Sequence, residues 1–293
     1  MLNGILLIDK PQNFTSFDVI AKLRGMTKQK RIGHSGTLDP MATGVLVCLL
    51  GSATKLSDLF PFSDKHYTAV MQLGICTDTQ DITGTVLSEN SSPVSLQELQ
   101  DALIHFRGEL LQTPPMYSAV SIGGRRLYDL ARQGLEVERP SRQINVYSLS
   151  LCSYDENTHI AVLDIHCSKG SYIRTLINDI GDFLSTGATL TGLRRTGANG
   201  FPLTACITLD DCQRLTQENR LEEFLLPVQM AFDSFERLNL DDWQAKMLKN
   251  GVSLSLSKLG DPASASYAVY HNNQFIGLGN ADFETRTMKL KQF

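Results

Sequence analysis

Hydrophobic residues recur along the chain at two spacings, and each spacing predicts a different kind of element. A fully apolar run at residues 45–50 fits either a buried strand or a buried helix segment. Shorter or alternating runs predict strands, because every second side chain of a strand faces the same side. Such runs occupy four segments: residues 5–8, 67–73, 144–151 and 160–167.

Helical spacing marks three further segments. We expect the first helix to stop at Gly25, and the third, whose apolar positions run from residue 173 to 184, to stop at Gly187. The first and second helices each begin with a capping signature, a hydroxyl residue followed three positions later by an acid: Thr15 with Asp18, and Ser95 with Glu98.

The tail beyond residue 238 shows a separate pattern. A short helix at residues 241–249 is followed by strand-like runs at 268–270 and 275–278, with two asparagines in the turn between them. We therefore predict a small β-rich domain at the end of the chain.

Composition narrows the class of protein. The chain has 293 residues, of which 42% are hydrophobic and 20% charged, enough for a sizeable core. Its six cysteines match no zinc pattern, so reduced buried thiols are expected. No apolar run reaches membrane length, and the apolar stretch near the start is too short for a signal peptide. These features predict a cytoplasmic protein.

The net charge of −4 argues against a protein that coats nucleic acid non-specifically, because phosphate binding depends on Lys and Arg. Basic residues nevertheless cluster at residues 28–31, 125–126 and 194–195. Composition alone therefore leaves RNA binding open.

Residues 31–44 carry the strongest candidate chemistry. Gly33 and Gly36 allow close approach of the backbone to a ligand, and Pro40 keeps Asp39 out of helical geometry. Asp39 is thus a carboxylate on a stiff, irregular loop, a common way to present a reactive group. A purely structural Asp-Pro turn explains the same residues equally well.

The segment from Gly33 to Gly44, Gly-His-Ser-Gly-Thr-Leu-Asp-Pro-Met-Ala-Thr-Gly, resembles the catalytic loop of the TruB family of tRNA pseudouridine-55 synthases. One departure from the family lies outside this segment: members usually carry glycine at the position of Asn13. Asparagine also tolerates a left-handed turn. The resemblance extends to about Arg195 through four more stretches in the family's order: residues 4–11 with Thr15-Ser16, residues 64–67, residues 167–175 and residues 193–195.

This resemblance implies an α+β pseudouridine synthase fold with a mixed, mostly antiparallel sheet. Residues 1–232 would form the catalytic domain, and an insertion at about residues 114–141 would fold over bound RNA. Residues 238–293 resemble the small PUA-like β domain that ends many RNA-modifying enzymes.

The resemblance also implies the reaction. The bond between ribose C1′ and uracil N1 breaks, the base rotates, and C5 bonds to the same sugar carbon. No cofactor and no metal is expected. Asp39 would act on the sugar or the ring as a nucleophile, or remove a ribose proton as a base, and either role requires the ionised carboxylate. The motifs supply one carboxylate, whereas an ordinary glycosidase uses two.

Further roles follow from the same resemblance. Arg174 would pair with Asp39 and keep it ionised; its place in the first turn of a helix, where the helix dipole disfavours cations, also favours a carboxylate partner. Tyr67 would stack on the flipped base and take part in proton transfer. Without the resemblance, a surface arginine and a core tyrosine explain these residues. The remaining positions lie in contact with the substrate or support the site: His34, Tyr172, Leu193 and Lys10.

The implied substrate is the T-arm of tRNA, with its uridine flipped out of the loop. We expect a monomer that needs no protein partner. Three alternatives remain: a guide-RNA-dependent relative, a tRNA-binding folding helper whose chemistry is secondary, and a nucleoside hydrolase.

Overall fold

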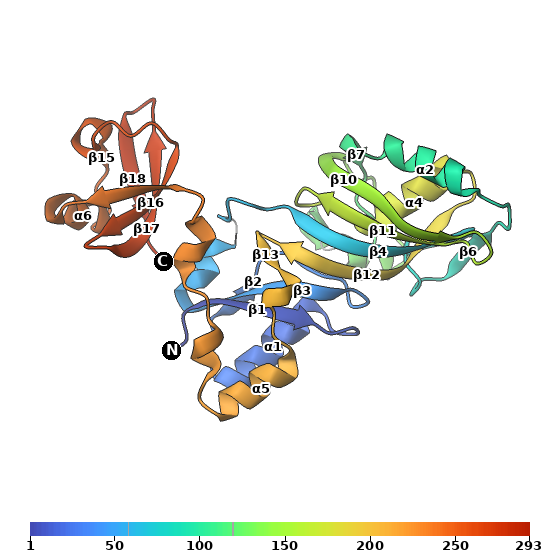
Figure 1. Ribbon diagram of the computed structural model, residues 1–293, viewed down its shortest axis with the longest axis horizontal. Helices are drawn as coiled ribbons and strands as arrows, with labels where there is room; N and C mark the ends of the chain where they lie inside the picture. Colours follow the sequence, from blue (N-terminus) through green and yellow to red (C-terminus); the bar gives the residue numbers. More distant parts are fainter. Residues whose placement is uncertain (58, 119) are drawn as a thin grey trace.

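A computed structural model of the chain describes residues 1–57, 59–118 and 120–293. Within these residues, a large sheet of nine strands runs through the molecule and a smaller five-stranded sheet lies at one end (Figure 1). The path of the large sheet is β1-β3-β12-β4-β11-β10-β7, with β2 paired to β3 and β13 to β12. Its strands are β1 (Gly4–Lys10), β2 (Ile32–His34), β3 (Thr43–Leu50), β4 (Lys65–Leu73), β7 (Gly108–Gln112), β10 (Arg142–Asp155), β11 (Ile160–Cys167), β12 (Ala188–Ala198) and β13 (Phe201–Pro202).

The pairing within this sheet is antiparallel except between β12 and β3, which run parallel. The sheet is therefore mixed and mostly antiparallel, which confirms the predicted fold class. The apolar run at residues 45–50 is a buried strand rather than a helix, since β1 and β2 pair with opposite edges of its backbone and helices cover its face.

Helices cover the large sheet in two groups. Helices α1 and α5 pack beneath β1 and β3, and α2 and α4 pack against the half of the sheet formed by β4, β10 and β11 (Figure 1). The bounds of the helices are α1 (Ser16–Thr27), α2 (Leu96–His105), α3 (Leu127–Ala131), α4 (Ile173–Phe183), α5 (Leu209–Gln217) and α6 (Asp242–Lys249).

Capping residues start the helices as predicted, but the glycines do not stop them. Thr15 and Ser95 each form a reciprocal capping box with the acid three residues later. Helix α1 continues through Gly25 to Thr27, and Lys28 takes the left-handed position that ends it, with φ 55°. Helix α4 ends at Phe183, four residues before the glycine expected to stop it.

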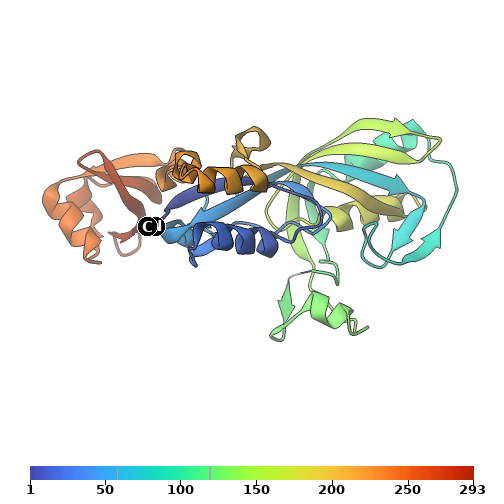
Figure 2. The same ribbon diagram turned by 90° about the horizontal axis from the view of Figure 1, so that it is seen from below.

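The segment predicted to fold over RNA projects from the body as a separate lobe (Figure 2). It contains a two-stranded hairpin, β8 (Ser121–Ile122) with β9 (Arg125–Arg126), followed by α3. Leu127 and Leu130 are buried within it, and most of its other described side chains are exposed. A second small hairpin, β5 (Ile75–Thr77) with β6 (Val86–Glu89), lies at the far end of the large sheet.

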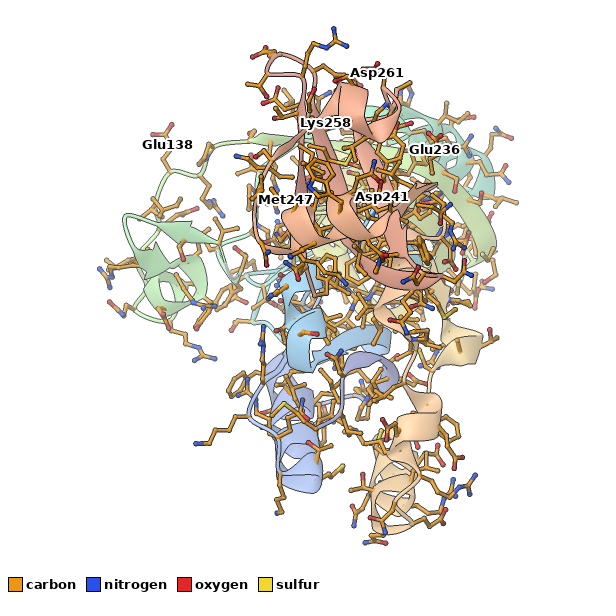
Figure 3. All side chains as sticks on the ribbon, turned by 90° about the vertical axis from the view of Figure 1, so that its left-hand side faces the viewer. Glu138, Glu236, Asp241, Met247, Lys258 and Asp261 are labelled. Carbon is orange, nitrogen blue, oxygen red and sulfur yellow. The ribbon has the colours of Figure 1, made fainter. Side chains whose placement is uncertain are left out.

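The C-terminal sheet has its own core and is joined to the large one by aromatic packing. Figure 3 shows its outer face, with α6 across it. At the junction, the ring of Phe232 stacks on those of Phe235, Phe275 and Phe293 at centroid distances of 5.5–5.8 Å. The strands follow the order β14 (Glu236–Leu240), β16 (Ser266–His271), β17 (Gln274–Asp282), β18 (Thr287–Lys291) and β15 (Leu254–Ser255).

Candidate active site

Asp39 lies on the loop of residues 35–42, between β2 and β3. Leu38 and Ala42 on either side of it are buried, so the loop is anchored in the core. The Ser16 hydroxyl, at the start of α1, accepts a hydrogen bond from the Leu38 amide at 2.8 Å and donates one back to the Leu38 carbonyl at 3.2 Å. The backbone next to the carboxylate is therefore fixed by a hydroxyl group as well as by apolar packing.

Two buried cations hold the same loop. Lys10 donates from Nζ to the Pro40 carbonyl at 3.3 Å and to the Phe14 carbonyl at 2.5 Å. Arg195 donates to the carbonyls of Gly36 and Thr37 at 3.2 and 3.3 Å, and from Nε to Val45 at 2.7 Å. Both side chains are fully buried, and burial lowers the pKa of Lys10 to about 8.

A glycine just after the loop, at the start of β3, is required sterically. Gly44 has φ +102°, and a Cβ there would lie 2.2 Å from the carbonyl oxygen of Arg195 on the parallel strand. No side chain fits between β3 and β12 at this point. The close approach of the two strands brings the start of β3, and with it the end of the Asp39 loop, next to Arg195.

The structure brings Arg174, in the first turn of α4, against Asp39. The Nε atom of Arg174 lies 3.0 Å from Oδ2 of Asp39, but its N–H does not point at this oxygen. Nη2 of Arg174 donates to Oδ1 of Asp39 at 3.4 Å. The arginine side chain is 4% exposed and that of Asp39 is 35% exposed. One face of the carboxylate is thus paired with a buried cation while another remains open to solvent.

A second carboxylate, Asp81, shares this arginine. Its Oδ2 lies 3.6 Å from Nη1 of Arg174, and its side chain is 6% exposed. Oδ1 accepts hydrogen bonds from the Thr79 hydroxyl and from the amide and hydroxyl of Thr83, which fix the carboxylate on the turn between β5 and β6. The prediction of a single carboxylate in this region missed Asp81.

The projecting lobe also contacts the arginine. Nη2 of Arg174 donates to the Tyr117 carbonyl at 2.8 Å, and Nη1 donates to the Thr79 carbonyl at 3.1 Å. Arg174 therefore connects the Asp39 loop, the turn that carries Asp81 and the base of the lobe.

The pKa of Asp39 is raised above its ordinary value. Burial is the largest cause, because it disfavours the charged form, and the negative charge of Asp81 adds to it. Arg174 and Lys10 lower the pKa but do not outweigh burial. The sequence predicts that Arg174 favours ionisation; the structure adds a larger opposing effect that depends on how much protein surrounds the loop.

Tyr67 and Leu193 line the same region from neighbouring strands. Tyr67, on β4, belongs to the core cluster that also contains Leu38 and Met41, and Leu193 packs against that cluster from β12. Tyr67 is 7% exposed, and burial raises its pKa. Its phenol is therefore neutral at pH 7, and its ring lies next to the loop that carries Asp39.

His34 and Tyr172 are held by different elements: His34 ends β2, and Tyr172 precedes α4. Nδ1 of His34 is buried without a hydrogen-bond partner, and burial together with the charge of Arg195 lowers the pKa of this histidine. Tyr172, which precedes α4, is held through its backbone: its amide donates to Gln112 Oε1 at 2.7 Å and its carbonyl accepts from Gln112 Nε2 at 3.0 Å. The guanidinium of Arg142 lies 4.8 Å from the centre of its ring.

Comparison with known proteins identifies the family. Residues 24–173 match the model of the TruB family pseudouridylate synthase (N terminal domain), and residues 174–233 match that of the tRNA pseudouridylate synthase B C-terminal domain. A protein of Clostridium tetani named tRNA pseudouridine synthase B is 42% identical over 281 residues, which cover 95% of each chain. This chain belongs to the TruB family of pseudouridylate synthases. A protein of the same name from Lactobacillus delbrueckii subsp. bulgaricus is 39% identical and covers 91% of each chain.

Solved structures agree with this TruB-family fold. The crystal structure of a Cbf5-Nop10-Gar1 complex contains a chain that matches with a TM-score of 0.76 at 22% identity, covering 99% of this chain and 84% of that one. A chain of the archaeal box H/ACA sRNP Nop10-Cbf5 complex matches with a TM-score of 0.73 at 21% identity, covering 99% and 86%. At these identities the comparison concerns the fold alone, and it extends over both sheets.

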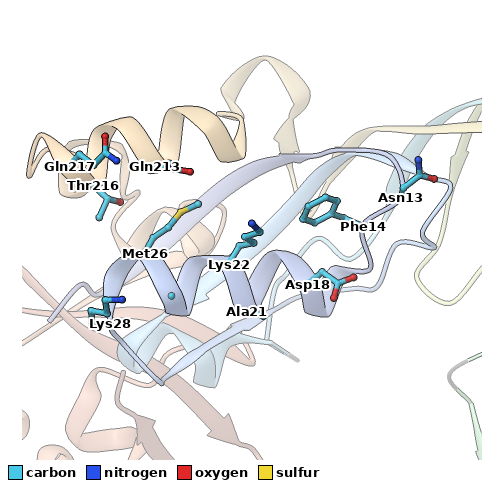
Figure 4. Close-up of a pocket in the computed structure, with 11 residues that line it drawn as sticks. Asn13, Phe14, Asp18, Ala21, Lys22, Met26, Lys28, Gln213, Thr216 and Gln217 are labelled. Atoms are coloured by element: carbon cyan, nitrogen blue, oxygen red, sulfur yellow. The ribbon is translucent and has the colours of Figure 1, made fainter.

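A groove of this TruB-family chain lies away from these residues. It has a volume of about 860 Å³ and runs between α1 and α5, with Phe14, Lys22, Met26 and Gln217 among its lining residues (Figure 4). None of the predicted site residues lines it. No helix among the described residues combines the length and the apolar character needed to cross a membrane.

Sequence reasoning missed three residues that shape the site: Asp81, Arg195 as an anchor of the loop, and Gln112. Threonines stand two residues before and two residues after Asp81, as in many turns, so its sequence carries no distinctive signal. Gln112 acts on the backbone of Tyr172, 60 residues away, and the pairing of β7 with β10 and of β10 with β11 brings the two together.

Proposed function

We propose that this protein converts the T-loop uridine at position 55 of tRNA into pseudouridine, with Asp39 as the catalytic carboxylate. The relatives named tRNA pseudouridine synthase B support tRNA as the substrate. The observation that carries the proposal is the pairing of Asp39 with Arg174 on an anchored loop, with one face of the carboxylate still open. The chain would act as a monomer without a protein partner.

The arrangement can perform the reaction as follows. With the target uridine flipped out of its loop, Asp39 reaches the sugar or the ring from its open face and acts in its ionised form, which Arg174 and Lys10 favour. Tyr67 lies against the base, where its neutral phenol can exchange a proton with the ring. His34 and Leu193 contact the extruded nucleotide, and Tyr172 borders the pocket. Unstacking the base costs a few kcal/mol, on the order of what such contacts recover.

The proposal is tested with a T-arm transcript incubated with purified protein and mapped for pseudouridine with carbodiimide. The wild-type protein should give one modification, at position 55. Asp39→Asn should lower product formation at least about 1,000-fold while RNA binding stays within a few-fold, because the amide cannot act as a base or nucleophile. Asp101→Asn, on the exposed face of α2, is the control and should behave as wild type.

Three outcomes would overturn the proposal. Loss of RNA binding in Asp39→Asn, with unchanged turnover for each bound RNA, would favour a folding helper. Free uracil in the reaction mixture would indicate a hydrolase. Modification that requires an added guide RNA would point to the guide-dependent alternative.

A further inference from the structure

Three side chains with metal-binding chemistry meet on the side of the large sheet opposite Tyr67. Asp64 immediately precedes β4 and His66 is its second residue, so both face away from Lys65 and Tyr67. His166, on β11, is the direct pairing partner of His66. One ligand atom from each residue lies within 4.8 Å of the other two; we call these residues the Asp64 cluster.

The contacts within the Asp64 cluster are close. His166 Nε2 lies 2.5 Å from Asp64 Oδ2, and His66 Nε2 lies 3.8 Å from the same oxygen. The two imidazole rings stack with centroids 3.9 Å apart. The side chains are 28%, 47% and 27% exposed for His166, His66 and Asp64, so an ion can reach them from solvent.

The surroundings leave space beside the cluster. A hollow of about 300 Å³ is lined by Asp64 and His166 together with Phe62 and Tyr147. On the other side, Gly197 of β12 pairs with His66, and a Cβ at this glycine would lie 3.2 Å from His66 Cδ2. The absence of a side chain at position 197 leaves room for the His66 ring to turn.

We propose that the Asp64 cluster binds one divalent transition-metal ion of the zinc class through two imidazole nitrogens and one carboxylate oxygen. Two histidines and one carboxylate are a common ligand set for such ions, and the ligand positions left over would be filled by water. The nearly parallel rings, 13° apart, do not yet direct both lone pairs at one point. A change in the side-chain torsions of His66, which is half-exposed, is therefore needed to direct both lone pairs at one ion.

This site is independent of the proposed reaction. Its ligands project from the side of the sheet opposite Tyr67, and none of them touches Asp39 or Arg174 in the described structure. The sequence predicts no metal, because 102 residues separate Asp64 from His166 and only the pairing of β4 with β11 joins them. A bound ion would link these two strands at the end from which Tyr67 extends.

The test uses the full-length, untagged protein, stripped of metal and titrated with Zn²⁺ by calorimetry. We expect saturable binding of one ion per chain, and at least about tenfold weaker binding in His66→Asn and in His166→Asn. His271→Asn is the matched control, because it removes a histidine that contacts Asp242 at 2.7 Å in the other sheet, and it should bind as wild type. Cys152→Ser, which removes an exposed thiol, should also leave binding unchanged.

A measurement on the unaltered protein covers the case in which a variant fails to fold. Zn²⁺ should shift the imidazole NMR resonances of His66 and His166 and leave those of His105 and His159 in place. The proposal is overturned by the absence of saturable binding, by wild-type affinity in His166→Asn, or by unshifted His66 and His166 resonances. In the first and last of these cases, Asp64 contacts the two histidines without a metal ion between them.

Discussion

The Asp39 loop and the projecting lobe both reach Arg174, but they are held in different ways. The loop is fixed by Ser16, Lys10 and Arg195 and by buried neighbours on both sides of Asp39. The lobe exposes most of its described side chains, and among these residues its hydrogen bond to the arginine comes from a single backbone carbonyl, that of Tyr117. The groups proposed to do the chemistry are therefore set before RNA binds, while the part proposed to cover RNA can be displaced at little cost in free energy.

Among the variants that test how the loop and the lobe are held, the largest effect is expected at Arg174, where the two regions meet. Arg174→Lys should lower product formation by about 100-fold or more, because an ammonium group cannot replace the guanidinium fork that contacts Asp39, Asp81 and Tyr117 together. Single-turnover rates with saturating T-arm RNA measure the change in the chemical step.

A matched arginine provides the control. Arg194 pairs with Asp9 at 2.7 Å but is 42% exposed, so Arg194→Lys should change the single-turnover rate by no more than a few-fold. Equal losses in the two variants would mean that Arg174 has no special place between the loop and the lobe.

Asp81→Asn separates two effects that Asp81 has on Asp39. The rate should fall by about tenfold, because the buried Arg174 loses one of its two carboxylate partners. The charge of Asp81 also raises the pKa of Asp39, so its removal lowers that pKa. If Asp39 acts when ionised, the variant should therefore stay active down to a lower pH than the wild type does.

The pH dependence of the single-turnover rate measures this shift. In wild type the acidic limb should lie above the range of an ordinary aspartate, since burial raises the pKa of Asp39. A shift of the limb to higher pH in Asp81→Asn would contradict the assignment of that limb to Asp39.

The sequence predicted the parts of the site that have a local signature. Both capping boxes follow from residue type and short spacing, whereas the α+β fold and the left-handed Asn13, with φ 64°, were expected from the resemblance. The pair of Asp39 with Arg174 came from the resemblance, and the roles given to these residues stay predictions. Asp81 could not be predicted, because its importance depends on which turn meets the first turn of α4.

The burial of Asp39 could not be predicted from the neighbouring residues in the sequence either. The motifs predict a cation next to Asp39, whereas the amount of protein around the loop depends on how β3, β12 and α4 pack around it. The direction of the pKa shift of Asp39 therefore emerged only with the structure.

An effect of about the same size as that of Asp81→Asn is expected at the base of the lobe. Gln112→Ala removes both hydrogen bonds to the backbone of Tyr172 and should lower the single-turnover rate by about tenfold, through misplacement of the first turn of α4. The matched control is Gln72→Ala, which removes a similar amide contact to the Thr158 carbonyl at the far end of the sheet. A pH profile of unchanged shape would agree with a positioning role.

Hydrogen exchange measures backbone opening rather than turnover, and it compares the two regions most directly. Amides of β8 and β9 should exchange within seconds in the free protein, because two short strands with exposed side chains open at little cost, whereas those of β3 in the buried sheet should stay protected for hours or longer. Bound T-arm RNA should slow exchange in β8 and β9 and leave β3 unchanged; the Asp39→Asn variant allows the complex to be measured without turnover. Strong protection of β8 and β9 before RNA is added would mean that the lobe is as firmly held as the Asp39 loop, and covering of the substrate would then need a different element.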